Sequence, residues 1–484
     1  MKKLFVAIIA LHSVAAAADD DVERLVGAML GDTPIISDLR SLTDEVGGRV
    51  TGSPANAAAV NWALARFRHA EVSVRREAFQ MPFQWQERTV TAKISGDTRF
   101  TPGVIAKPFS AGTENLSGSL LDGGTGTAAD FERLGDEATG AWILVGTALL
   151  DDDIGLAGLF GEYSAAATTV PLAVDAGAAG IVFMSSRTNN LLYRLPMLSA
   201  VDRLPALLME REDALRAQRL IRAGQALSLR ATVDVDSGYA YEAANVIGEI
   251  RGSERPQEIV LIGAHLDSHD LGTGALDNGA NATMIIDIAR QITRLGLKPK
   301  RTIRFALWNG EEQGLVGSWR YTLQHRDELD NHIVAAAFDI GTGRLLGFYT
   351  GGMGELAPLL DQYLQPVAGL DPFENLNVPV VGTDNFDFMM QGVPNLIGHQ
   401  ADANYASNYH AASDTFDKVD QQQLKLNSAI AAAMTWGFAN DDKRLPRWSR
   451  EQVGNLVKNT DLEEQMRNFG VWEDWVSGQR GRRR

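Results

Sequence analysis

The sequence contains no cysteine among its 484 residues. Disulfide bonds, thiolate metal ligands and a cysteine nucleophile are therefore excluded, and any metal site must use His, Asp and Glu. Basic residues are few relative to acidic ones, 45 against 61, which gives a formal net charge of −16. Binding to nucleic acid or to anionic lipid is therefore not expected. What is present is the composition of an ordinary folded protein, with 45% hydrophobic and 22% charged residues.

The first residues have the order of a secretory signal peptide. A basic start at Lys2 and Lys3 precedes a short apolar stretch, Leu4–Leu11, and small residues follow at Ala15–Ala18. This order favours a signal peptide over residues 1–18 rather than a buried N-terminal helix. No later apolar run is long enough to span a bilayer. We expect an exported protein, periplasmic or secreted, with no membrane contact after the leader is removed.

The composition and hydrophobic pattern of the rest of the chain change along its length. Residues 116–237 combine short apolar runs with turns rich in Gly, Ala and Thr, which is typical of a small β-rich module. From Ala244 the pattern becomes repeated strand and helix, and the apolar runs at 258–267 and 302–308 are typical of strands covered on both faces. This alternation predicts an α/β fold with a mainly parallel, doubly wound sheet and helices on both faces.

Acidic residues and a histidine gather where three predicted strands end. His265 and Asp267 end the first strand, the adjacent Glu311 and Glu312 end the second, and Asp339 ends the third. Because ligands of such sheets lie beyond the carboxyl ends of the strands, these side chains are expected at one edge.

Two further residues extend this cluster: Asp277, in the loop after the first strand, and His410, farther along the chain. Imidazole nitrogen and carboxylate oxygen without thiolate favour a zinc site, although cobalt or manganese remain open as the native metal.

Spacing divides the roles within this cluster. His265 and Asp267 share one face of a strand, so the Asp267 carboxylate is expected to hold the second ring nitrogen of His265. Asp277 has two carboxylate oxygens and could bridge two metal ions. Glu311 and Glu312 are neighbours and point in different directions, so one can bind metal while the other acts as a general base.

The remaining residues near the cluster have more than one interpretation. His269 and His399 could act beside the ligands or on the substrate, but a purely structural role is favoured. Tyr409 could donate a hydrogen bond to a developing oxyanion or could simply pack. The histidines in helix or turn contexts without an acidic cluster are expected at the surface: His69, His325 and His332.

Four stretches together resemble the motif series of the di-zinc exopeptidases that include the bacterial aminopeptidases. They are GAHLDSHDLGTGALDNGA (263–280), RFALWNGEEQGLVGS (304–318), FDIGTG (338–343) and YHAASDT (409–415). The series as a whole is specific, although any single piece would be weak. Within these enzymes the likeness to the carboxypeptidase Q group, also called plasma glutamate carboxypeptidase, covers most of the mature chain.

The resemblance implies two zinc ions per chain that share one carboxylate. The ligands of the first ion would be His265, Asp277 and Asp339. Those of the second ion would be Asp277, Glu312 and His410, and Glu311 would be the general base. The sequence departs from the group at His269, where carboxypeptidase Q has tryptophan.

The resemblance also implies a discontinuous domain layout. Residues 19–115 and 238–440 would form the zinc peptidase domain, interrupted by a protease-associated-type insert at 116–237. A C-terminal extension at 441–484 lies largely outside the resemblance, and its basic end is expected to be solvated and partly disordered.

These features predict a co-catalytic zinc exopeptidase that hydrolyses dipeptides and short peptides. A free, cationic N-terminus would be attracted by the carboxylates of the site, Asp384 among them. A broad-specificity aminopeptidase is the alternative of the same chemistry. A single-zinc glutaminyl cyclase and a non-catalytic binding relative are the alternatives of the same fold. The expected partner is a peptide substrate, and a homodimer remains one open oligomeric state.

Overall fold

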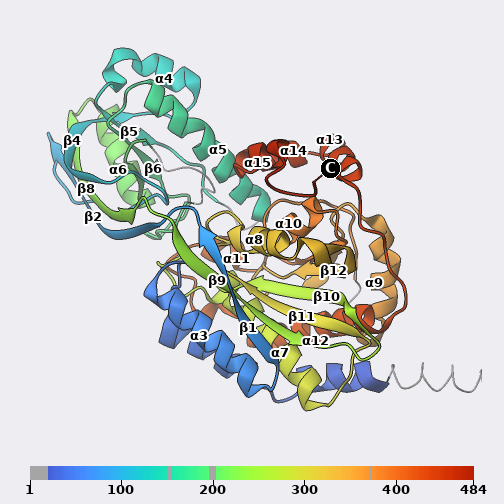
Figure 1. Cartoon of the computed structure of the whole chain (residues 1–484). Helices are drawn as coiled ribbons and strands as arrows, with labels where there is room; N and C mark the ends of the chain where they lie inside the picture. Colours follow the sequence, from blue (N-terminus) through green and yellow to red (C-terminus); the bar gives the residue numbers. More distant parts are fainter. Residues whose placement is uncertain (1–19, 151–154, 196–202, 371–372, 484) are drawn as a thin grey trace, which may run out of the picture.

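The computed structural model describes residues 20–150, 155–195, 203–370 and 373–483 (Figure 1). The predicted signal peptide lies outside the described residues. Two seven-stranded sheets form the framework of the molecule. Within the described ranges, no helix is both long enough and apolar enough to cross a membrane.

The first sheet has the strand order β1-β9-β11-β10-β12-β14-β13. Its strands are β1 (Ser73–Met81), β9 (Tyr241–Ile250), β10 (Arg255–His265), β11 (Arg301–Trp308), β12 (His332–Ala337), β13 (Leu345–Tyr349) and β14 (Asn395–Gln400). The central strands β11, β10, β12 and β14 are parallel, as the alternation predicts, whereas β1, β9 and β13 pair antiparallel. The sheet is therefore mixed rather than mainly parallel. Residues 251–254 are too few for a crossover helix, so the chain reverses direction between β9 and β10.

Helices cover both faces of the first sheet (Figure 1). One face packs against α3 (Pro54–His69), α7 (Ala280–Arg294) and α12 (Gln421–Asn440), and the other against α8 (Val316–Gln324) and α10 (Asn385–Met390). The shorter helices of this part are α2 (Ile35–Arg40), α9 (Ala357–Tyr363) and α11 (Tyr405–Asn408). Side chains such as Ile285 and Ile288 are fully buried against the strands. Each such side chain contributes about 1.5–3 kcal/mol through burial, which fixes the strand ends that carry the site.

The second sheet has the order β2-β8-β4-β5-β6-β7-β3. Its strands are β2 (Trp85–Gly96), β3 (Val104–Ala106), β4 (Thr113–Asp122), β5 (Trp142–Val145), β6 (Gly180–Met184), β7 (Ala206–Met209) and β8 (Leu227–Ser237). Helices α4 (Ala128–Leu134), α5 (Gly155–Asp175) and α6 (Arg211–Arg222) pack with it. Figure 1 shows these elements at the upper left as a separate body, which we call the second lobe (described residues between 85 and 237).

The second lobe differs from the expected insert at 116–237 in two respects. Strands β2 and β3 precede residue 116 and yet belong to the second sheet. The sequence does not separate β1 from β2, because both alternate and only residues 82–84 lie between them. The lobe also contains the long helix α5, whose residues include few charges and so show no polar face. The division of the chain into domains stays a prediction.

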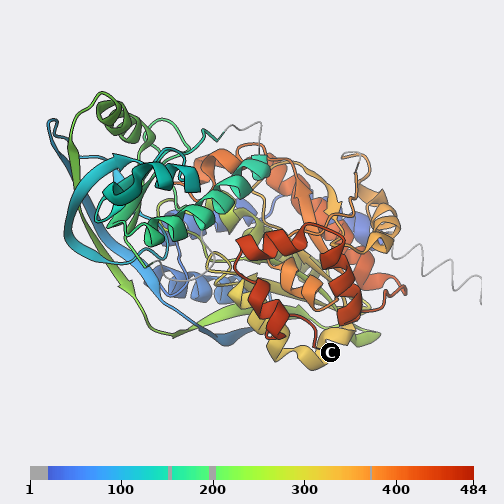
Figure 2. The same cartoon turned by 90° about the horizontal axis from the view of Figure 1, so that it is seen from above.

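The C-terminal segment (residues 450–483) forms α13 (Arg450–Lys458), α14 (Leu462–Asn468) and α15 (Trp472–Ser477). Figure 2 shows these helices, in red, beside α5 of the second lobe, and α14 contacts α5 while α13 contacts α10. The expectation of a solvated basic end is wrong for Arg480, which is 2% exposed. The reason is a buried partner, Asp387 of α10, whose carboxylate accepts two hydrogen bonds from Arg480 at 2.8 and 2.7 Å.

One histidine expected at the surface is buried instead. His332 starts β12 and is 2% exposed, with its Nε2 atom 3.1 Å from the Tyr321 hydroxyl. Burial lowers the pKa of His332 to about 3, so the ring is neutral and packs within the sheet layer. The sequence placed it in a turn because it lies at the strand boundary.

Candidate metal centre

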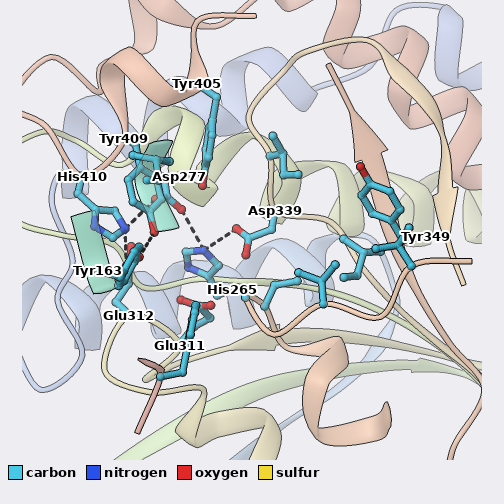
Figure 3. A pocket seen from close by; sticks show the side chains of 18 residues that line it. Tyr163, His265, Asp277, Glu311, Glu312, Asp339, Tyr349, Tyr405, Tyr409 and His410 are labelled. Atoms are coloured by element: carbon cyan, nitrogen blue, oxygen red, sulfur yellow. Dashed lines mark hydrogen bonds and ion pairs between the residues drawn. The ribbon is translucent and has the colours of Figure 1, made fainter. Parts of the chain in front are cut away.

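The parallel strands deliver the predicted residues to one edge of the first sheet. His265, the last residue of β10, lies in register with Trp308, the last residue of β11. Glu311 and Asp339 follow closely after β11 and β12. Figure 3 shows the predicted histidines and carboxylates facing one another around one space.

The first group consists of His265, Asp277 and Asp339. The Nε2 atom of His265 lies 2.9 Å from Oδ1 of Asp339 and 3.1 Å from Oδ1 of Asp277. One donor atom of each residue falls within 4.8 Å of the other two. All three residues are buried, so the group has the spacing of ligands around a single cation.

The second group lies beside the first and shares Asp277 with it. The Nε2 atom of His410 lies 3.0 Å from Oε2 of Glu312 and 3.3 Å from Oδ2 of Asp277. The two oxygens of Asp277 thus face different histidines, Oδ1 toward His265 and Oδ2 toward His410 (Figure 3). A carboxylate in this position can bridge two cations.

A further residue joins the second group. His269 lies in the loop after β10, and its Nε2 atom is 3.1 Å from Oε2 of Glu312, the same oxygen that faces His410. The sequence favoured a purely structural role for His269. The signal that pointed the other way was its position within the same motif as His265 and Asp277. His399, in contrast, stacks on Tyr349 with ring centroids 4.5 Å apart.

Unpartnered buried atoms test whether these groups fit a metal. Oε1 of Glu312 has no hydrogen-bond partner among the described residues, and Oδ2 of Asp277 and Nε2 of His269 each have only an ion-pair contact within the site, with His410 and Glu312 respectively. A buried polar atom without a partner costs free energy, and a cation at each group would satisfy these atoms. Nitrogen and oxygen donors without sulfur fit zinc.

Local electrostatics separate the two adjacent glutamates. Burial raises the pKa of Glu311 well above its usual range, and the neighbouring carboxylate of Asp339 adds to that rise. Burial also opposes ionisation of Glu312, but the imidazoles of His269 and His410 hold its pKa well below the usual range. The environments therefore shift the pKa values of Glu311 and Glu312 in opposite directions. This is the pattern expected of one proton acceptor and one ionised ligand.

Asp267 supports the site in a different way from the one expected. Nδ1 of His265 lies 3.0 Å from the main-chain carbonyl of Asp267, whereas the nearer carboxylate oxygen lies 3.7 Å away. Oδ2 of that carboxylate instead accepts hydrogen bonds from the Thr51 hydroxyl at 2.8 Å and the Gly310 N–H at 2.9 Å. Asp267 thus fixes the ring of His265 through its backbone and fixes the turn before Glu311 through its side chain.

Asp414 holds the loop that carries Asp277, a role that sequence reasoning missed. Its carboxylate accepts hydrogen bonds from the N–H groups of Ala275, Leu276 and Asp277, at 3.0, 2.7 and 3.2 Å. Burial raises the pKa of Asp414 to about 7. Its position in the same motif as His410 was the available signal.

Both groups border a cavity of about 310 Å³. Its wall is largely apolar and aromatic, formed by Ile340, Tyr349, Val378, Val380, Ile397, Tyr405 and Tyr409. The second lobe adds Leu159 and Tyr163, and the C-terminal segment adds Phe469. Three separate parts of the chain therefore enclose the space beside the predicted metal ligands.

The two predicted substrate-binding residues lie in different positions. Tyr409 lines the cavity, stacks on His410 with ring centroids 3.5 Å apart, and is hydrogen-bonded through its hydroxyl to that of Tyr163. Asp384 is 1% exposed, whereas its neighbour Thr383 lines the cavity. Burial raises the pKa of Asp384 well above its usual range.

Comparison with known proteins agrees with this geometry. Residues 245–435 match the model of peptidase family M28. This stretch is similar to peptidase family M28. It contains every residue of both groups, from His265 to His410, and the resemblance to exopeptidases predicted from the motifs is confirmed.

The similarity to a curated relative covers only part of the chain. Carboxypeptidase Q of Xenopus laevis is 30% identical over 247 residues, which are 51% of this chain and 52% of that protein. The chain thus spans about half the length of the curated relatives it matches.

Solved structures extend the likeness of fold. A peptidase M28 precursor from Shewanella amazonensis SB2B has a TM-score of 0.80 and 26% identity, covering 90% of this chain and 99% of that chain. A zinc aminopeptidase from Bacillus subtilis has a TM-score of 0.66 and 20% identity, covering 85% of this chain and 96% of that chain, and shares the fold. The α/β fold of this chain is therefore one that known peptidases share.

Proposed function

We propose that this chain is a zinc exopeptidase that binds two zinc ions and hydrolyses dipeptides and short peptides with a free N-terminus. The observation that carries the proposal is the placement of Asp277, whose two oxygens face His265 and His410 on opposite sides. His265 and Asp339 would hold one ion, Glu312 and His410 would hold the other, and Asp277 would contact both.

Bound zinc would act as a Lewis acid and lower the pKa of water toward about 7. Glu311 borders the cavity next to both groups, and its raised pKa suits a group that takes and returns a proton. It accepts one proton from the water that attacks the peptide carbonyl carbon. It then gives that proton to the leaving nitrogen as the C–N bond breaks, so the products are a carboxylic acid and an amine.

The shape of the cavity supports a preference for short substrates. Tyr163 of the second lobe and Phe469 of the C-terminal segment both line it, and their rings stack with centroids 5.5 Å apart. These two parts of the chain therefore meet beside the site. An internal segment of a long peptide would need room on both sides of the cut bond, whereas a dipeptide needs only the space of this cavity. The apolar wall favours apolar side chains in the substrate.

One carboxylate that is not assigned to metal supports the requirement for a free N-terminus. Glu311 lines the cavity and is not a ligand of either ion in this proposal. A cationic α-amine close to it gains attraction that an acetylated amine does not. On the resemblance to the exopeptidase motif series, we propose that residues 116–237 of the second lobe form a protease-associated-type insert. On the order of residues 1–18, which is that of a signal peptide, we propose that the protein is exported.

Three substrates test the proposal on the metal-loaded protein. The assay measures release of amine from an apolar dipeptide, from its N-acetylated form and from a ten-residue peptide blocked at both ends. The zinc content of the protein is measured in parallel. We expect rapid cleavage of the free dipeptide, slow cleavage of its acetylated form and no internal cleavage. Efficient cutting of the blocked peptide would overturn the exopeptidase assignment. Cyclisation of an N-terminal glutamine peptide without hydrolysis would replace it with a glutaminyl cyclase.

A further inference from the structure

His269 has the position of a metal ligand rather than of a supporting residue. Its Nε2 atom and that of His410 converge on one oxygen of Glu312, at 3.1 and 3.0 Å. Donor atoms of these three residues all lie within 4.8 Å of one another. The His269 side chain is 12% exposed, and the polar contact of its Nε2 atom is the one with Glu312, inside the second group.

We propose that His269 is an additional ligand of the second metal ion, which it would hold together with His410, Glu312 and one oxygen of Asp277. This inference rests on the proposed function, because it requires that the second group binds a metal. It assigns to His269 a role that the sequence did not favour.

Ring tautomers in the site agree with this role. Nδ1 of His410 lies 3.3 Å from the main-chain carbonyl of Arg194 and can donate its proton there. That hydrogen bond leaves Nε2 of His410 with a free lone pair, directed at Glu312 and at the space that it shares with His269. Two neutral imidazoles directed at one carboxylate oxygen are stabilised more by a cation bound between the three groups than by contact with each other.

The additional ligand would make the two ions unequal. The first ion would have three ligands from the chain, His265, Asp277 and Asp339. With His269, the second ion has four protein ligands, as structural zinc sites do. Two imidazoles also favour zinc more strongly than carboxylates alone. The second ion should therefore be the more tightly held, and the first should be the more readily exchanged.

The experiment compares His269→Phe with His325→Phe in the full-length protein. His325 is a matched control, because its Nε2 atom lies 3.0 Å from Glu77, its ring stacks on Tyr321 with centroids 4.2 Å apart, and its side chain is 15% exposed. Phenylalanine keeps a ring at each position and removes both nitrogens. The zinc bound by each protein is measured across a series of zinc-buffered solutions.

We expect two affinities in the wild type and in His325→Phe, with the tighter one weakened in His269→Phe on the order of 100-fold or more, since even partners outside the ligand shell are worth 10–100-fold. X-ray absorption on the wild type gives a second measurement that needs no variant. Three imidazoles shared between two zinc ions are expected if His269 is a ligand, and two if it is not.

Each result has one meaning. Two bound ions in the wild type, an unchanged zinc affinity in His269→Phe and two imidazoles by X-ray absorption would overturn the role of His269 alone. A wild-type protein that binds no zinc under any of these conditions would overturn the proposed function and this inference with it. If His269→Phe does not fold, the imidazole number decides.

Discussion

The buried pair between Arg480 and Asp387 predicts how the C-terminal segment is held over the site. The guanidinium donates two parallel hydrogen bonds to the carboxylate at 2.8 and 2.7 Å, and the two side chains are 3% and 1% exposed. The same guanidinium lies 3.3 Å from the carbonyl of Leu315, in the loop that follows Glu312. Arg480 therefore connects the C-terminal segment, which carries Phe469, to α10 and to the loop that follows Glu312.

The perturbation is Arg480→Met, which keeps much of the side-chain volume and leaves the carboxylate of Asp387 buried without its partner. Breaking a buried ion pair on one side typically costs about 3–5 kcal/mol. Because 1.4 kcal/mol corresponds to a factor of ten, local opening of the C-terminal segment should become roughly 100- to 4000-fold more frequent. Amide hydrogen exchange in peptides from residues 450–483 measures this directly.

The pH dependence follows from the same carboxyl group. Burial raises the pKa of Asp387, and Arg480 opposes that rise. In Arg480→Met the folded-state pKa rises further above the unfolded value of about 4. The destabilisation of Arg480→Met relative to the wild type should be small below about pH 4. It should grow as the pH rises toward the folded-state pKa of Asp387 and should reach its full size above that pKa.

Two further variants control this prediction. Arg467→Met breaks a pair between Arg467 and Glu463 on the same segment, where the side chains are 53% and 46% exposed, and should cost no more than about 1 kcal/mol. The double variant Arg480→Met/Asp387→Leu removes both charges and should recover most of the stability. If Arg480→Met opens no more often than Arg467→Met, the reasoning about this pair is refuted.

The remaining predictions concern the site. Glu311→Gln should lower kcat for a dipeptide about 10²–10⁴-fold with zinc content unchanged, whereas Glu312→Gln should lose zinc; the reverse pattern would mean that their roles are exchanged. Asp277→Ala should lose the first ion, which keeps only His265 and Asp339, and should weaken the second, which keeps His269, Glu312 and His410; an unchanged zinc affinity at either site would contradict the bridging role. Phe469→Ala removes one side of the cavity wall, so KM for an apolar dipeptide should rise while peptides longer than three residues are cut faster; an unchanged length preference would show that the C-terminal segment does not limit substrate size. Protein exported by its native host should begin between Ala17 and Asp20, and a retained Met1 would contradict the leader.

The sequence by itself determined the elements that carry the site. Apolar runs fix where β10, β11 and β12 form, because a strand covered on both faces has no polar positions until it ends. Parallel strands that end at one edge must bring His265, Glu311 and Asp339 together. The lack of cysteine limited the ligands to nitrogen and oxygen, and the resemblance to the exopeptidase motif series implied the ligand roles of Asp277 and His410.

The tertiary structure alone decided what surrounds those residues. His269 joins the second group because its loop folds back toward Glu312, and no periodicity in the sequence encodes the path of that loop. Tyr163 and Phe469 are separated by some three hundred positions and stack only because the second lobe and the C-terminal segment pack against each other. The sequence predicted that Arg480 is part of a solvated basic tail, whereas in the structure it forms a buried ion pair with Asp387. Local patterns specify strands and helices, whereas contacts between distant side chains depend on how whole elements pack, which one sequence does not reveal.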